Sequence, residues 1–221
     1  KLMNTIELLN KGIDKLKTKK IRTSQIDSEI LLSKILNKTR EKMLTSLEKS
    51  VNDKNILEFD RLILRRLEKE PVAHILKEKE FWSKNFEINK STLIPRPETE
   101  LMVDRLVKIY KNKKISIIDI GTGSGCILIS ILSELKNSYG VGIDISKDAI
   151  KIAKKNAKKH KILNNVRFIN KSITDTHNRK YDLVVSNPPY IKTRDINYLD
   201  DGVKMYEPLS LIHISEPTRP S

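Results

Sequence analysis

The chain has 221 residues, of which 38% are hydrophobic and 32% charged, a composition typical of a globular protein with one or two domains. No apolar run approaches the ~20 residues of a membrane-spanning helix, and the single cysteine excludes an internal disulfide and a cysteine-based metal cluster. The first residues lack the apolar core of a signal peptide, so we expect a cytoplasmic protein without membrane association.

The formal net charge is +15, from 43 Lys and Arg against 28 Asp and Glu. Such a charge attracts polyanions, including nucleic acids. The lysines, however, are scattered rather than interleaved with aromatic residues, and Lys, Ile and Asn are abundant together, as codon bias would produce. Charge describes association and not fold, so both interpretations stay open.

Residues 1–76 predict a small helical bundle. Apolar residues recur there at helical spacing, first at Ile6, Leu9, Ile13 and Leu16. A second helix is expected to begin at a Ser24 cap. A longer amphipathic helix should end before Pro71, because the residue before a proline disfavours helical geometry.

From Lys77 the pattern changes to an alternation of apolar and polar residues. In EFWSKNFEINKSTLIP this alternation predicts a short β-hairpin, and we assign residues 77–95 to a connector. Pro95 and Pro97 then flank Arg96, and a helix is expected over Glu98–Tyr110.

Strands alternate with helices over the rest of the chain, residues 96–211. The predicted strands are Ile115–Ile120, Tyr139–Ile145, Val166–Asn170 and Tyr181–Ser186, and the helices between them are Cys126–Leu135 and Lys147–His160. Continuous apolar strands alternating with helices indicate an α/β domain whose parallel sheet is covered on both faces.

The glycine-rich stretch DIGTGSG, residues 119–125, follows the first of these strands and opens a helix. Its glycines permit positive φ and let a ligand approach the backbone. Asp144 closes the next strand, where a carboxylate can accept hydrogen bonds from two ribose hydroxyls. Asp144 as a helix cap is the alternative, a role that Ser146 could take instead. We expect a nucleoside-containing ligand at the carboxyl ends of these strands.

The stretch VVSNPPYI, residues 184–191, ends the fourth strand with an amide, two prolines and a phenol. A planar amide or exocyclic amine nitrogen is a poor nucleophile, and two acceptors that hold its hydrogens would align it with a sulfonium methyl group. The Asn187 side-chain oxygen and the Pro188 carbonyl are the candidate acceptors, Pro189 stiffens the loop, and Tyr190 offers a flat face. An ordinary strand-ending loop is the alternative. The motif favours S-adenosylmethionine over NAD as the ligand.

The motifs together resemble one family. They are EPVAHI (70–75), EFW (80–82), TLIPRPETE (92–100), DIGTGSG (119–125), GIDIS (142–146), SNPPYI (186–191) and YEPLSL (206–211). They are similar to those of the protein N5-glutamine methyltransferases that modify class-1 peptide-chain release factors, the PrmC/HemK family. NPPY alone also occurs in amino-methylating enzymes of DNA and RNA, whereas TLIPRPETE with a helical domain is far more specific.

The resemblance implies methyl transfer from S-adenosylmethionine to the glutamine side chain of a Gly-Gly-Gln loop. It implies a helical bundle that recognises the release factor, a β-hairpin connector and a Rossmann-like class I methyltransferase domain, in a monomer with no metal and no direct nucleic-acid contact. The cofactor-binding residues it implies are Gly121, Thr122, Gly123, Ser124, Gly125, Asp144, Ile173, Asn187, Arg96 and Glu98. Those holding the substrate amide and forming the catalytic motif are Asn187, Pro188, Pro189 and Tyr190.

The chain departs from the family pattern at several places. Lys77 stands where a glycine is usual, and Ser172 and Ile173 replace an acidic and an aromatic residue, so weaker cofactor binding is expected. Residues 212–221 do not resemble the family, and the sheet is expected to be incomplete after its fourth strand. Two other functions stay open: an adenine N6-type nucleic-acid methyltransferase, which the aromatic content of 5% disfavours, and an inactive truncated remnant.

Overall fold

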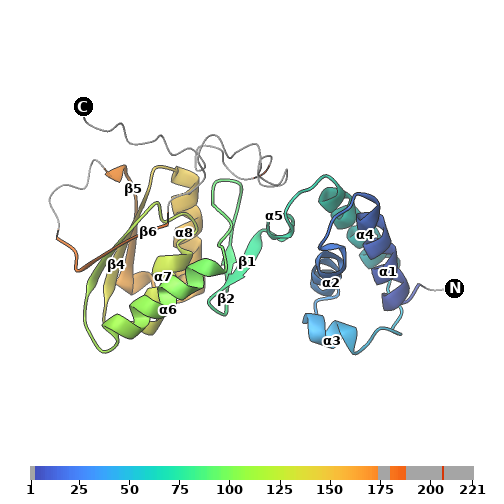
Figure 1. The fold of residues 1–221 in the computed structure, drawn as a ribbon, viewed down its shortest axis with the longest axis horizontal. Helices are drawn as coiled ribbons and strands as arrows, with labels where there is room; N and C mark the ends of the chain where they lie inside the picture. Colours follow the sequence, from blue (N-terminus) through green and yellow to red (C-terminus); the bar gives the residue numbers. More distant parts are fainter. Residues whose placement is uncertain (1–2, 174–179, 188–205, 207–221) are drawn as a thin grey trace. The chain divides into compact units, whose positions relative to one another are not determined.

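A computed structural model describes residues 3–173, 180–187 and 206 of the chain. Pro188, Pro189 and Tyr190, three of the expected site residues, lie outside the described residues. The chain divides into two units, Lys1–Leu76 and Lys77–Ser221, and each is described by itself (Figure 1).

The first unit is helical, as expected. It contains α1 (Thr5–Thr18), α2 (Ser24–Ile35), α3 (Arg40–Leu44), α4 (Asp53–Leu67) and α5 (Val72–Leu76). Its core is made of buried side chains from all five helices and the segment after α3, among them Leu8, Leu31, Met43, Val51, Phe59, Ile63 and Ile75. Phe59 reaches α1 at Gly12, where an added Cβ would lie 2.6 Å from its Cζ atom.

The expected cap of the second helix was wrong by one residue. Ser24 is the first residue of α2, and Thr23 precedes it without a side-chain bond to the helix backbone. The Thr23 hydroxyl instead donates to the Asp27 carboxylate at 2.7 Å, which also accepts from Arg66 Nε at 2.7 Å. Asp27 therefore bonds both the start of α2 and the end of α4.

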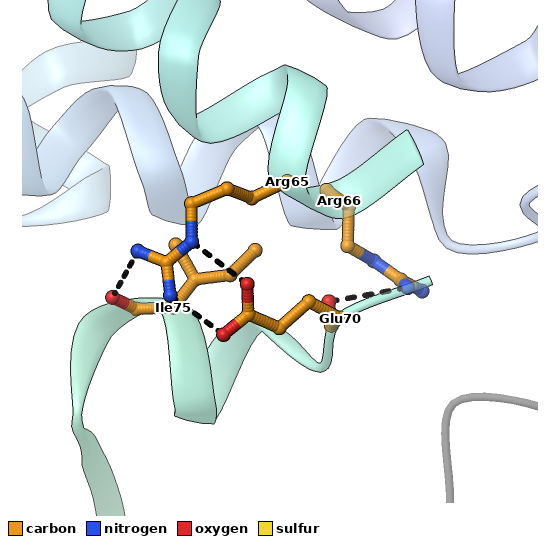
Figure 2. A network of polar contacts seen from close by, with 4 residues as sticks. All are labelled: Arg65, Arg66, Glu70 and Ile75. Carbon is orange, nitrogen blue, oxygen red and sulfur yellow. Dashed lines mark hydrogen bonds and ion pairs between the residues drawn. The ribbon is translucent and has the colours of Figure 1, made fainter. Parts of the chain in front are cut away.

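The turn between α4 and α5 is held by charged hydrogen bonds (Figure 2). The Arg65 guanidinium donates to both carboxylate oxygens of Glu70, at 2.7 and 2.6 Å, and to the Ile75 carbonyl at 3.3 Å. Arg66 donates to the Glu70 carbonyl at 3.4 Å. Bidentate pairs of this kind fix geometry as well as charge, so Glu70 in EPVAHI orders the turn that ends the helical unit.

The second unit begins with the expected hairpin. Strands β1 (Glu78–Phe81) and β2 (Lys84–Glu87) are antiparallel, and Trp82 and Ser83 form the turn between them with φ of 53° and 52°. Helix α6 spans Glu98–Tyr110, as the sequence predicted.

A four-stranded parallel sheet follows, which confirms the α/β class. The strands are β3 (Ser116–Ile120), β4 (Tyr139–Asp144), β5 (Val166–Asn170) and β6 (Leu183–Ser186), in the order β5-β4-β3-β6. Helices α7 (Cys126–Glu134) and α8 (Lys147–Lys159) connect β3 to β4 and, with a short 3₁₀ turn at Leu163–Asn165, β4 to β5. The order places β3 and β4 in the centre, so their carboxyl ends, Ile120 and Asp144, are neighbours.

The fourth strand begins two residues later than predicted. Asp182 lies before it and accepts hydrogen bonds from the Ser116 backbone N–H and hydroxyl at 2.8 and 2.7 Å. The Asp182 carboxylate therefore accepts from the Ser116 N–H, which a longer β6 would bond through its backbone instead.

The larger core of this unit lies on one face of the sheet. Side chains of α6, α7, α8 and the hairpin pack there against inward-facing strand residues such as Ile117, Phe168 and Val185. Ile118, Val141 and Ile143 form a smaller cluster that shares no buried residue with it. Helices α6, α7 and α8 all contribute to the larger cluster, so the expected cover of a second face is not seen among the described residues of this unit.

Candidate cofactor-binding site

The glycine-rich loop turns the chain sharply between β3 and α7. The N–H groups of Gly121 and Thr122 donate to the Ile143 carbonyl at 2.9 and 3.0 Å, and the Gly125 N–H donates to the Thr122 carbonyl at 2.8 Å. Gly121, Gly123 and Gly125 have φ of 69°, 54° and 78°. Glycine adopts these left-handed conformations without the steric cost that other residues bear, so the spacing of the glycines follows from the shape of the turn.

The three glycines differ in what surrounds them. A Cβ at Gly121 would meet no atom within 4 Å, and one at Gly123 would meet only the Gly121 oxygen at 4.0 Å. The backbone of these two residues is therefore open to a ligand. A Cβ at Gly125 would lie 3.0 Å from Phe168 and 3.2 Å from Ala153, so the third glycine is needed for packing of α7 against β5 and α8.

Substitution of these glycines separates packing from ligand contact. We expect Gly125→Ala to lower the unfolding free energy by about 2–4 kcal/mol, because strain at positive φ and overpacking add. Gly123→Ala should cost only about 1–2 kcal/mol, from strain alone, yet still weaken binding of a ligand to the loop. Urea unfolding and ligand titration of both variants check this, and equal stability losses would contradict it.

Asp144 joins the ends of the two central strands. Its Oδ2 atom accepts from the Gly123 N–H and its Oδ1 atom from the Ser146 N–H, both at 2.9 Å, and the residue is buried. A carboxylate offers about four lone-pair sites, so each oxygen keeps capacity for a ligand hydroxyl. Ser146, and not Asp144, caps α8, since its hydroxyl oxygen accepts from the Ala149 N–H at 3.2 Å.

Asp119 is a residue that the sequence analysis missed. It is 1% exposed near the end of β3, and burial raises the pKa of its carboxyl to about 7, against the lowering effect of a 2.7 Å hydrogen bond from Thr122. The negative charge of Asp144 raises it further. Its Oδ1 atom has no hydrogen-bond partner among the described residues. An acid inside the apolar strand SIIDI, two residues before the first glycine of the loop, was the available signal.

The raised pKa of Asp119 predicts a specific pH dependence. The folded protein keeps this proton up to about pH 7, whereas the unfolded chain loses it near its ordinary value of 3.8. The folded state thus binds more protons in this window, and the contribution of Asp119 to the unfolding free energy falls as pH rises from about 4 to about 7. Denaturant unfolding of the wild type and Asp119→Asn should diverge across this window, and parallel profiles would refute the assignment.

Asn187 lies directly after β6, at the third neighbouring strand end. Its side-chain nitrogen is 3.4 Å from the Thr99 hydroxyl in the first turn of α6, a long hydrogen bond. This contact brings the PRPETE segment to the end of β6 and leaves the amide oxygen of Asn187 unused by it. Thr99 was not predicted, and its neighbours Arg96 and Glu98, which were, are exposed.

Two family models match the chain. Residues 7–76 match the PrmC N-terminal domain, and residues 111–214 match a methyltransferase domain. A release factor glutamine methyltransferase from Aliivibrio fischeri is 39% identical over 203 aligned residues, which cover 91% of this chain and 71% of that protein. The chain belongs to the release factor glutamine methyltransferase family.

Longer relatives and solved structures are also similar. A bifunctional methyltransferase from Rickettsia typhi is 38% identical over 84% of this chain and 40% of its own length. The chain spans 40–44% of the length of five such bifunctional relatives. A solved SAM-dependent methyltransferase from Agrobacterium tumefaciens aligns with 51% of this chain and 39% of its own, at 16% identity and a TM-score of 0.44.

In this member of the release factor glutamine methyltransferase family, a buried asparagine connects the hairpin to the glycine loop. Asn156 of α8 donates to the carbonyls of Glu87 and Ser124 at 2.9 and 2.8 Å, and accepts from the Glu87 N–H at 2.7 Å. It is fully buried. The sequence analysis missed it, although an amide on the apolar face of α8 was visible in IAKKNA.

The remaining expected residues of this family member are placed as follows. Thr122 and Ser124 are buried in the loop, and Ile173 is 53% exposed after β5.

No group of three His, Cys, Asp or Glu side chains able to hold a metal occurs within the described residues. Likewise, no helix in the described ranges is long and apolar enough to cross a membrane.

Proposed function

We propose that this chain transfers a methyl group from S-adenosylmethionine to the side-chain nitrogen of the glutamine in a Gly-Gly-Gln loop of class-1 peptide-chain release factors. One observation carries the proposal most directly. The glycine loop, Asp144 and Asn187 follow three adjacent parallel strands, β3, β4 and β6, and Asp144 bonds directly to the loop. Ligands of open α/β sheets bind at such carboxyl ends.

The residues at these strand ends fit the cofactor. Open backbone at Gly121 and Gly123 admits a ligand, and Asp144 retains acceptor capacity for the two ribose hydroxyls. Asp144 places a carboxylate where a cationic ligand would be stabilised. When bound, S-adenosylmethionine supplies a methyl group on a positively charged sulfur. Arg96, Glu98 and Ile173 are proposed to border the same ligand.

Asn187 is proposed to hold the nucleophile. Its side-chain oxygen and the Pro188 carbonyl would accept the two hydrogens of the glutamine amide, which directs the nitrogen lone pair toward the methyl group. Pro189 would keep this loop rigid and Tyr190 would stack on the planar amide. No base is required before transfer, because the amide proton leaves after the new N–C bond has formed.

Three segments of the chain are proposed to have separate roles. Residues 1–76 would recognise the release factor, and residues 96–211 would carry out the methyl transfer. Residues 77–95 would connect these two domains. A match of residues 7–76 to the PrmC N-terminal domain supports the first assignment. A cytoplasmic, monomeric enzyme is the corresponding expectation for the whole protein.

A methyl-transfer assay tests the proposal. The full chain is incubated with S-adenosylmethionine and a class-1 release factor, and peptide mass spectrometry locates any added methyl group. We expect it on the glutamine of Gly-Gly-Gln and none on a release factor with that glutamine replaced by alanine. Methylation of adenine in DNA or RNA, without methylation of the release factor, would favour the nucleic-acid alternative instead.

A further inference from the structure

Helix α8 carries a concentration of positive charge that the proposed reaction does not use. Its 13 residues, Lys147–Lys159, include six lysines and a single acid, Asp148. In the other long helices, α1, α2, α4 and α6, basic and acidic residues balance to within one charge. Codon bias would enrich lysine in every helix alike, so it does not explain this helix.

The lysines of α8 form one exposed stripe. Lys147, Lys151, Lys154 and Lys158 follow helical spacing along about 16 Å of the surface, opposite a buried face that contains Ile150 and Ala153. Lys151 pairs with Asp148 at 2.8 Å. Within residues 3–173 and 180–187, neither Lys154 nor Lys158 forms an ion pair with a carboxylate.

A groove of ≈ 670 Å³ extends the stripe toward the sheet. Lys154, Lys158 and Arg167 line it together with apolar residues that include Leu163 and Ile169. Arg167 comes from β5, which is the outer strand in the observed order. Lys155 lines it as well, so four cations from two elements face one concave surface.

We infer that this lysine stripe and groove, defined by Lys147, Lys151, Lys154, Lys158 and Arg167, bind the phosphate backbone of RNA. Regularly spaced point charges complement a polymer of regularly spaced phosphates better than the mixed charges of a protein surface. Among the residues that the structure describes, Phe168 is the one aromatic residue that lines the groove. It is 6% exposed and so does not offer a face for base stacking, and binding should be independent of sequence.

The choice of RNA as the polyanion rests on the proposed function, because the proposed substrate, a release factor, acts in translation, where RNA is abundant. It revises the expectation of no direct nucleic-acid contact. That expectation came from the family resemblance. The low aromatic content, which disfavoured a nucleic-acid methyltransferase, argues against recognition of bases but not against contact with phosphates.

Charge reversal on the stripe tests the inference. The full chain, Lys154→Glu/Lys158→Glu and a control, Lys54→Glu/Lys114→Glu, are titrated with a short labelled RNA duplex of mixed sequence between about 50 and 200 mM salt. All four lysines are exposed. Each double variant replaces two lysines by glutamate, so the two variants have equal net charge. The stripe variant should bind at least about tenfold more weakly, with a salt slope smaller by about 2, whereas the control should bind nearly as well as the wild type.

Three results would overturn the inference: no RNA binding by the wild type, equal losses in both variants, or unchanged RNA binding by the stripe variant. A stripe variant that loses methylation of the release factor but keeps RNA binding would assign the surface to the protein partner. Unfolding temperature and S-adenosylmethionine binding should be unchanged in both variants. The RNA titration contains no release factor, so its result is distinguishable from a failure of the proposed function.

Discussion

Asn187→Ala is expected to lower kcat for methyl transfer by about 10²–10³-fold, the usual effect of removing one positioned polar group from a transition state. The physical reason is the loss of one acceptor for the amide hydrogens of the glutamine. Affinity for S-adenosylmethionine should change little, because the glycine loop and Asp144 are untouched. Single-turnover methylation and separate cofactor titrations measure the two quantities.

Thr99→Val is the matched control for this prediction. It removes the hydroxyl that lies 3.4 Å from the Asn187 nitrogen but leaves the amide oxygen in place. We expect a loss of only about tenfold, since a long hydrogen bond contributes little to orientation. Equal rate losses for both variants would show that Asn187 acts by fixing α6 and not by holding the substrate.

Asn156→Leu is expected to lower the unfolding free energy of the second unit by about 3–4 kcal/mol. The substitution leaves the Glu87 N–H and the carbonyls of Glu87 and Ser124 without the bonds that Asn156 makes at 2.7–2.9 Å. Buried polar groups that lose their partners cost about 1–3 kcal/mol each before relaxation. Because Ser124 lies in the glycine loop, cofactor affinity should fall with stability.

Asn165→Leu provides the comparison. Asn165 also bonds two carbonyls, those of Lys136 and Ser138, at 3.0 and 3.2 Å, but it is only partly buried and lies outside the site. Water can replace its bonds, so a loss of about 1 kcal/mol is expected. Urea unfolding of both variants, followed by tryptophan fluorescence of Trp82, measures the difference. Similar losses would mean that Asn156 has no special connecting role.

The elements of the second unit could be predicted from the sequence, because each depends on a local pattern. The helix Glu98–Tyr110 follows two prolines, and the strands Ser116–Ile120 and Val166–Asn170 are short apolar runs next to turn residues. The expected role of Asp144 in ribose binding also rested on a local pattern, because Ser146 could cap the next helix in its place. Ser146 does cap α8 and Asp144 bonds Gly123, while contact of Asp144 with a ribose stays a prediction.

The contacts that sequence reasoning missed join residues that are distant in the chain. Asn156 bonds Glu87, 69 residues away, and Asn187 meets Thr99 across 88 residues. No periodicity reports such pairs, because each depends on how two elements pack. The pKa of Asp119 likewise depends on burial beneath the loop, which the sequence SIIDI does not state. The start of α2 differs from the predicted Ser24 cap, because Thr23 holds the cap position and its hydroxyl donates to the Asp27 carboxylate.

The most direct test of the central claim is calorimetric titration of the full chain with S-adenosylmethionine. We expect saturable binding to one site per chain, with at least about tenfold lower affinity in Asp144→Asn, which loses the charged acceptor for ribose hydroxyls. Asp148→Asn is the matched control, because Asp148 is exposed and pairs only with Lys151 among the described residues. No binding by the folded wild type, or equal affinities in both variants, would contradict a cofactor site at these strand ends.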